Sequence, residues 1–251
     1  IYKSDRYGFR NDDAKWDAPV ENVIIGDSFA RGACAQRGPA DLIPNSLSLG
    51  VAGVGPLIEL AIMEEYAPRA KRVFWLFYEA NDLHINLARE REQDWLTHAF
   101  RGPRDDKWLR RETERRMTAP TPRQTATWAE WLGAVAKLLH LRDKLGLTSC
   151  PKFNQDFDYL GKIFTAAKRW TEARGGELIL VYLPGQWSCS FFRIGDRRVN
   201  WFYDGALKAM EHSGAKIIDL KNQPIEVWYP GSHFSQRGYE QLVGHLQRFG
   251  R

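Results

Sequence analysis

Val23-Ile24-Ile25-Gly26-Asp27-Ser28-Phe29 has the pattern of a buried strand that ends in a tight turn. The short β-branched apolar run is typical of such a strand, and the Gly-Asp-Ser turn presents one small polar residue at its end. That residue is Ser28. If Ser28 is a nucleophile, the rest of the chain must supply a base and hydrogen-bond donors for an oxyanion.

Four more apolar runs predict strands, at residues 46–50, 72–78, 177–183 and 216–220. The run at 72–78 is almost uninterrupted, which indicates a strand buried on both faces of a parallel sheet. Helical patterns lie between these runs, at 28–36, from Pro56 onward, and at 156–174, 198–213 and 235–248. The alternation predicts a three-layer α/β/α sandwich with a mostly parallel five-stranded sheet.

Residues 86–150 interrupt this alternation. Charge runs of mixed sign at 89–92 and 110–116 indicate solvated helix faces, and an apolar stripe at helical spacing follows at 128–141. We therefore expect one domain, residues 1–251, with a predominantly helical insertion at about 86–150. Residues 1–21 are expected to pack across the domain surface without contributing chemistry.

The composition is that of one globular domain of 251 residues, with 43% hydrophobic and 27% charged residues. The net charge is +5, but the two signs are interleaved and no nucleic-acid-binding motif is present, so no nucleic-acid partner is expected. Aromatic residues make up 13% and include ten Trp. They fit either core packing or ring-bearing ligands such as carbohydrates.

No apolar run is long enough to span a membrane, and no signal-peptide pattern is present. Because the first residue is Ile1, we expect a mature form or an excised domain whose membrane anchor lies outside this chain. A bacterial, periplasmic or otherwise extracytoplasmic soluble domain is the expectation for localisation.

The three cysteines fit neither a zinc spacing nor a complete disulfide framework. A bridge between Cys150 and Cys189, with Cys34 buried, is one arrangement that an oxidising compartment would allow. No metal or nucleotide signature appears, so no cofactor is expected. The sequence does not indicate an oligomeric state.

His233 is the best candidate for the base, because it lies in a Pro/Gly loop just before the terminal helix. The other five histidines lie on predicted helices or in the insertion, where a surface role is the default. The oxyanion donors would be the backbone N–H groups of Ser28 and Gly53 and the side-chain amide of Asn81. Each residue follows the end of a different strand, so the candidates are expected to converge at one cleft.

These residues resemble the four blocks of the SGNH, or GDSL-type, hydrolase superfamily. Gly-Asp-Ser-Phe at 26–29 resembles the first block, Gly-Val-Ala-Gly at 50–53 the second, Glu-Ala-Asn-Asp at 79–82 the third and Ser-His at 232–233 the last. The resemblance covers about 22–83 and 177–248 and implies a flavodoxin-like sandwich with an acyl-enzyme mechanism. It also implies that Asp27 is a structural turn residue.

Two positions depart from the family pattern. Glu79 stands where the family usually has Gly, two residues before the Asn, and Pro230 stands where it usually has Asp, three residues before the His. A backbone carbonyl in that loop would then orient His233 and give a Ser-His dyad, or a carboxylate from elsewhere would do so. Asp219 and Glu226 are the candidate carboxylates.

Three functions are compatible with the sequence. The leading hypothesis is a serine esterase that removes O-acyl groups, in particular acetyl groups, from a carbohydrate. The second is an O-acetyltransferase that passes the same acyl group to a polysaccharide hydroxyl. The third is a non-catalytic SGNH-like domain that binds a polysaccharide or a partner protein, for which the missing Asp at Pro230 is the argument.

Overall fold

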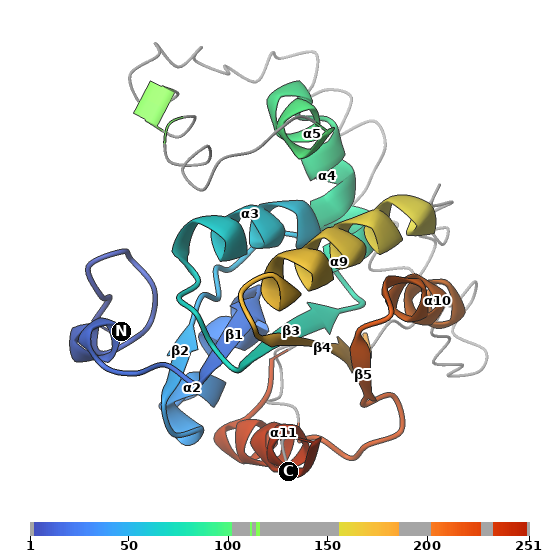
Figure 1. Cartoon of the computed structure of the whole chain (residues 1–251). Helices are drawn as coiled ribbons and strands as arrows, with labels where there is room; N and C mark the ends of the chain where they lie inside the picture. The colour runs from blue at the N-terminus through green and yellow to red at the C-terminus, as the bar shows by residue number, and fades with distance from the viewer. Residues whose placement is uncertain are drawn as a thin grey trace, which may run out of the picture.

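A five-stranded, fully parallel sheet forms the centre of the fold (Figure 1). The computed structural model describes residues 3–101, 111, 114–115, 156–185, 202–226 and 233–249. The strand order is β2-β1-β3-β4-β5. The strands are β1 (Asn22–Gly26), β2 (Ser46–Ser48), β3 (Arg72–Tyr78), β4 (Glu177–Leu183) and β5 (Lys216–Asp219). Each coincides with an expected run to within two residues, so the predicted α/β fold is confirmed.

Helices cover both faces of the sheet, which makes the sandwich three layers thick (Figure 1). One face carries α3 (Pro56–Tyr66), α9 (Phe157–Glu172) and α10 (Tyr203–Ser213). The other carries α1 (Ser28–Arg31), α2 (Pro39–Leu42) and α11 (Gln236–Phe249). The flavodoxin-like arrangement expected from the resemblance is therefore the one observed.

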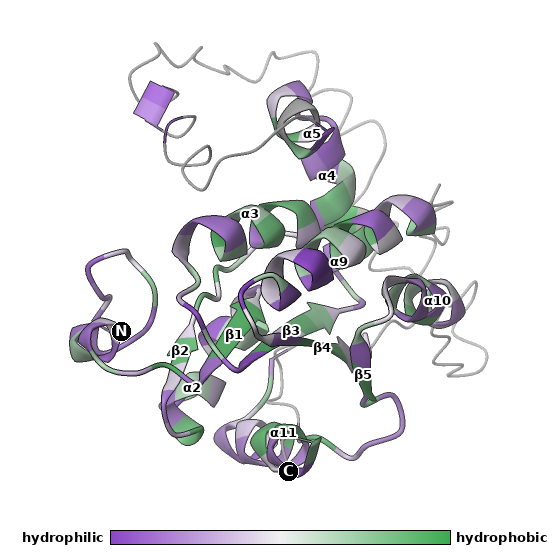
Figure 2. Ribbon diagram, viewed as in Figure 1, coloured by the Kyte–Doolittle hydropathy of each residue, from purple (hydrophilic) through white to green (hydrophobic). Residues whose placement is uncertain are grey.

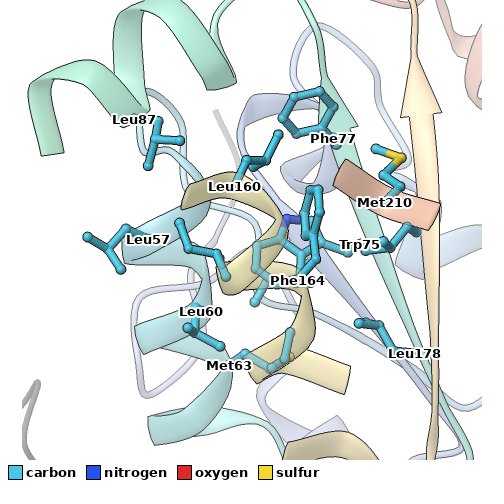
Figure 3. Packing of buried hydrophobic residues seen from close by; sticks show 14 of the residues in the cluster. Leu57, Leu60, Met63, Trp75, Phe77, Leu87, Leu160, Phe164, Leu178 and Met210 are labelled. Atoms are coloured by element: carbon cyan, nitrogen blue, oxygen red, sulfur yellow. The ribbon is translucent and has the colours of Figure 1, made fainter. Parts of the chain in front are cut away.

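Side chains of the central strands alternate between two hydrophobic cores. In β3, Trp75 and Phe77 point to the core under α3 and α9, whereas Phe74 and Leu76 point to the core under α11. This is why the strand has no polar alternation: both of its faces are buried. Figure 2 shows the apolar centre of the sheet between amphipathic helices. Figure 3 shows Trp75, Phe77 and Phe164 packed in the core under α3 and α9.

The local structure differs from the sequence expectations at two places. A π-helix, η2 (Asp82–Leu87), follows β3 closely, and the helix predicted at 28–36 ends at Arg31 and is followed by the separate short helix α2. Pro39 at the first position of α2 and the Asp41 carboxylate, which accepts a hydrogen bond from Gly38 N at 2.9 Å, explain this short helix. Neither feature changes the order of the strands.

The described part of the expected insertion contains η2, α4 (Ala88–Arg91) and α5 (Asp94–Arg101). Most of the remaining insertion lies outside the described residues, as do Cys150, Cys189 and Pro230. The third cysteine, Cys34, is exposed, so the expectation that it is buried is wrong. Within the described residues, no helix is both long and apolar enough to cross a membrane.

The N-terminal segment packs on the domain, as expected, and includes the short 3-10 helix η1 (Asp13–Asp17). Asn11 pairs with the backbone of β2, since its Oδ1 accepts from Ser48 N at 2.8 Å and its Nδ2 donates to Ser48 O at 2.9 Å. Asp5 fixes the turn before it by accepting hydrogen bonds from Phe9 N and Trp16 Nε1. These buried contacts hold the segment against the edge of the sheet.

We expect Gly50→Ala to lower the free energy of unfolding by about 1–3 kcal/mol, because the new methyl group must displace backbone. A Cβ at Gly50 would lie 2.1 Å from Arg31 N, where α1 ends. Urea denaturation measures the effect. Gly244→Ala is the control, since its Cβ would meet no atom within 4 Å on α11 and the change should be neutral or slightly stabilising. Equal effects of the two substitutions would contradict the close packing at Gly50.

Candidate active site

Ser28 and His233 meet at the carboxyl edge of the sheet. Ser28 is the first residue of α1, directly after β1, and its Oγ lies 2.8 Å from His233 Nε2. The His233 ring packs on the Phe29 ring, with ring centroids 5.2 Å apart. The adjacent Phe234 also packs on the Phe29 ring. The two residues are far apart in sequence, and the fold places them at hydrogen-bond distance, which is the geometry that a nucleophile and its base require.

Asp27 links this pair to the end of β3. Its Oδ1 accepts a hydrogen bond from Phe29 N at 2.9 Å, and its Oδ2 accepts from Asn81 Nδ2 at 2.9 Å and from Ser28 Oγ at 3.3 Å. The side chain is fully buried, and this burial raises the pKa of Asp27, while the hydrogen bonds and the proximity of His233 oppose the increase. Asp27 therefore does more than shape the turn expected for it from sequence.

The position of Asp27 also determines how Asn81 is oriented. Because a carboxylate only accepts hydrogen bonds, the amide of Asn81 must turn its nitrogen toward Asp27. The nitrogen carries a second N–H, which is left for another acceptor. Asn81 Oδ1 is buried and has no hydrogen-bond partner among the described residues. One N–H of Asn81 is thus held by Asp27, and the other can serve an oxyanion.

Two backbone N–H groups, those of Ser28 and Gly53, are candidates for the oxyanion hole, and they lie in different kinds of local structure. Ser28 N is at the N-terminus of α1, and Gly53 lies in an exposed turn after β2 with φ of +77°. In the described part of the chain, neither N–H donates a hydrogen bond to the protein. No hydrogen bond joins Gly53 to Ser28 there, and the role of Gly53 stays a prediction.

The loop that contains Gly53 is held by residues just beyond the third block. Asn86 Nδ2 donates to Val54 O at 2.8 Å, and the Glu90 carboxylate accepts from Gly55 N at 2.6 Å and Leu57 N at 2.9 Å. Glu90 therefore caps α3 from another helix, α4. Sequence reasoning treated Glu90 as part of a solvated charge run and missed this role, because nothing local to 89–92 indicates it.

Glu79, which replaces the family's usual Gly, is buried and ties together two other segments. Its Oε2 accepts from Gly185 N at 3.0 Å, just after β4, and its Oε1 accepts from Phe202 N at 3.1 Å, just before α10. The carboxylate thus provides an acceptor for two backbone N–H groups of buried residues. The departure from the family pattern adds a structural cross-link beside Asn81.

Neither candidate carboxylate for orienting the base is bonded to His233 in the described part of the chain. Asp219 accepts hydrogen bonds from Tyr203 Oη at 2.6 Å and from Lys221 N at 2.8 Å. Glu226 accepts from Ser235 Oγ at 2.7 Å. Ser235 Oγ in turn accepts from Gly238 N at 3.0 Å, which makes Ser235 the N-cap of α11. Glu226 therefore supports the helix that follows His233.

No group of three or more His, Cys, Asp or Glu side chains within the described ranges is arranged to hold a metal ion. The polar groups at this edge are those of an acid–base site: a hydroxyl, an imidazole, an amide and a buried carboxylate. The chain is therefore a parallel α/β/α protein. At the carboxyl edge of its sheet, Ser28 after β1 is paired with His233 before α11.

Comparison with known proteins finds a distant structural similarity and no match in sequence. No protein-family description matches the chain, and no curated protein matches it in sequence. Among solved structures, the chain is similar to a carbohydrate acetylesterase family member from Sinorhizobium meliloti, with 10% sequence identity and a TM-score of 0.41. The similarity covers 92% of this chain and 97% of that chain.

The pKa of Glu90 predicts a specific pH dependence of stability. Burial raises this pKa from its ordinary value of 4.5 to about 7, against the opposing hydrogen bonds from the start of α3. Between these values the native state keeps a proton that the unfolded state has lost, so the contribution of Glu90 to stability falls as the pH rises through about 7. We expect wild type to lose about 3 kcal/mol more than Glu90→Gln between about pH 4.5 and 8.

Urea denaturation of both proteins at the two pH values measures this difference. Glu92→Gln, at an exposed position on the same segment, is the matched control and should follow the wild type. Comparison of variants is needed because burial also raises the pKa values of Asp27, Glu59 and Asp82. A Glu90→Gln protein whose pH dependence equals that of the wild type would contradict the assignment.

Glu79→Ala should lower the free energy of unfolding by about 2–4 kcal/mol, because two buried N–H groups lose their acceptor. Glu79→Gln keeps one acceptor oxygen and should cost less than Glu79→Ala. Glu172→Ala is the control, since it removes only a surface pair with Lys168 and should cost under about 1 kcal/mol. Urea denaturation ranks the three variants, and a Glu79→Ala protein as stable as Glu172→Ala would rule out the cross-link.

Proposed function

We propose that this chain is a serine hydrolase of the SGNH type that cleaves O-acyl esters through an acyl-enzyme. The observation that carries the proposal is the distance of 2.8 Å between Ser28 Oγ and His233 Nε2. The order of the four sequence blocks and the placement of Asn81 beside this pair support it. A domain that only bound a ligand would have no need for a serine and a histidine in this contact.

In the first step, the hydroxyl proton of Ser28 turns from Asp27 to His233 Nε2, which takes it while Ser28 Oγ attacks the acyl carbon. The carbonyl oxygen becomes an oxyanion, for which the free N–H of Asn81 and the N–H groups of Ser28 and Gly53 are the proposed donors. Collapse of this tetrahedral intermediate breaks the bond to the alcohol oxygen, which takes the proton back from His233. The products are a free alcohol and an acyl group on Ser28.

In the second step, a nucleophile removes the acyl group from Ser28 by the same proton transfers in reverse order. Water gives up a proton to His233 and attacks the acyl carbon, and Ser28 Oγ leaves with that proton. If a sugar hydroxyl took the place of water, the same site would act as an O-acyltransferase. Product analysis with an acyl donor and an oligosaccharide acceptor distinguishes the two outcomes, because hydrolysis releases free acid and transfer does not.

His233 is proposed to act without a carboxylate from Asp219 or Glu226. Packing on Phe29 orients the ring. In serine enzymes a missing carboxylate partner can cost about 10⁴ in turnover. We therefore propose a Ser-His dyad whose turnover is lower than that of an enzyme with a complete triad.

The proposed substrate is an acylated carbohydrate, with acetyl as the acyl group. The family resemblance supports this finer assignment. A small acyl group also fits the burial of Ser28, which is 7% exposed. An extracytoplasmic location is proposed on the same grounds of resemblance.

Ser28→Ala should reduce hydrolysis of p-nitrophenyl acetate by at least about 10³-fold, because no other group replaces the nucleophile. His233→Ala should give a similar loss. The matched controls are Ser46→Ala, at the start of β2 on the opposite edge of the sheet, and His212→Ala, exposed on α10. Both controls should retain activity. A Ser28→Ala protein as active as wild type would contradict the assignment of the active site.

Labelling with a fluorophosphonate separates an enzyme from a binding domain without knowledge of the substrate. An activated serine forms a covalent phosphonate ester, so wild type should label on Ser28 and His233→Ala should label far more slowly. A folded wild-type protein that does not label would favour the non-catalytic alternative.

A further inference from the structure

A cleft of about 1150 Å³ has His233 among its lining residues. One wall is the loop after α1, where Ala33, Cys34, Ala35 and Gln36 line the cavity, and the other is the N-terminal segment from Lys3 to Asp13. The sequence indicated no chemistry for this segment. Because this segment lines the same cleft as His233, the proposed base, it can contribute to substrate binding.

The wall formed by residues 31–36 is fixed by hydrogen bonds rather than by its own sequence. The guanidinium group of Arg10 donates to the carbonyl oxygens of Gly32, Ala35 and Gln36. The loop is also attached to α11, since Tyr239 Oη donates to Ala33 O at 3.3 Å. A cavity bounded by such contacts is largely preformed, as binding sites for small molecules usually are.

The chemistry of the site determines which part of an ester would lie here. The proton that leaves His233 Nε2 goes to the oxygen of the departing alcohol, so this oxygen must be next to His233 when the ester bond breaks. The rest of the alcohol then continues beyond His233. His233 lines the cleft and Ser28 is not among its lining residues, which favours the side of the alcohol over the side of the acyl group.

The lining of the cleft indicates the class of alcohol. Charged groups of both signs are present, including Lys3 on one hand and Asp12, Asp13 and Asp41 on the other. Apart from His233, the lining residues within the described ranges include no aromatic ring and no aliphatic residue larger than Ala. A strongly charged ligand would meet its own sign here, whereas hydroxyl groups can donate to carboxylates and accept from Lys3.

We propose that the cleft between residues 3–13 and 31–36 binds the alcohol part of the substrate, and that this part is a hydroxyl-rich, uncharged chain such as an oligosaccharide. The inference rests on the proposed function for its direction, since it uses His233 as the proton donor. It assigns the N-terminal segment to substrate recognition, with Arg10 as a positioning residue for the opposite wall.

Cys34 provides the test, because its exposed side chain lines the cleft and no proposed chemistry uses it. A bulky maleimide adduct of poly(ethylene glycol) on Cys34 should fill the cleft. We expect it to lower kcat/KM for O-acetylated xylo-oligosaccharides by at least about tenfold, and to change kcat/KM for p-nitrophenyl acetate by less than about twofold. Cys34→Ser treated with the same reagent is the control, since Cys150 and Cys189 remain in it.

A second measurement does not depend on turnover. Xylo-oligosaccharides without acetyl groups should slow the reaction of Cys34 with a small maleimide, followed by mass spectrometry of the peptide that contains Cys34. Protection of Cys34, together with the selective loss of oligosaccharide turnover, supports the cleft. An adduct that slows both esters equally, or unchanged labelling at saturating oligosaccharide, overturns it.

The two measurements also separate this inference from the proposed function. If wild type hydrolyses p-nitrophenyl acetate in a Ser28-dependent way but Cys34 is not protected, the cleft assignment fails and the hydrolase remains. If Cys34 is protected but neither ester is turned over, the hydrolase fails. The cavity then binds carbohydrate without being the alcohol side of an esterase, which overturns the assignment as stated.

Discussion

The buried carboxylate of Asp27 joins the ends of β1 and β3, and the geometry of the candidate site depends on it. It accepts hydrogen bonds from Phe29 N, Asn81 Nδ2 and Ser28 Oγ. Burial of a carboxylate is costly, and these three bonds offset part of the cost. With one side chain, the fold caps α1, orients the amide of Asn81 and positions the hydroxyl of Ser28.

The topology of the sheet explains why these groups meet between β1 and β3. The order β2-β1-β3-β4-β5 means that the chain leaves β1 toward one edge and then returns to add β3 on the other side. The connections after β1 and β3 therefore diverge to opposite faces, which opens a crevice at their carboxyl ends. Ser28 follows β1 and Asn81 follows β3, so both lie at this crevice.

The sequence predicted those features that are encoded locally. The apolar runs gave the positions of the strands, since a strand buried on both faces needs an apolar residue at every position, as at 72–78. Ser28 and His233 were identifiable because each stands alone in a Gly- or Pro-containing turn beside a strand or helix end. The contact between them still required the fold, since no pattern in one sequence measures a distance between such remote residues.

The residues that support the site could not be predicted, because they act at long range on backbone groups. Glu79 bonds to Gly185 and Phe202, Glu90 bonds to Gly55 and Leu57, and Arg10 bonds to residues 32–36. A backbone N–H or carbonyl has the same chemistry in every residue, so its partner leaves no mark in the local sequence. Glu90 and Arg10 therefore had the appearance of ordinary surface charges.

The buried acids beneath this edge have a consequence for the chemistry proposed above it. Glu59 and Asp82 are fully buried, and burial raises the pKa of each carboxyl group well above its ordinary value. Repulsion from Asp27 adds to this increase for Glu59, and repulsion from Glu59 adds to it for Asp82. Each group also retains one buried oxygen without a partner among the described residues. An ionised carboxylate here would repel an oxyanion forming beside Asn81, which directly precedes Asp82. Because burial favours the protonated form of both acids, it opposes two further negative charges near the proposed oxyanion, in addition to that of Asp27. The same desolvation that costs stability therefore favours the proposed reaction.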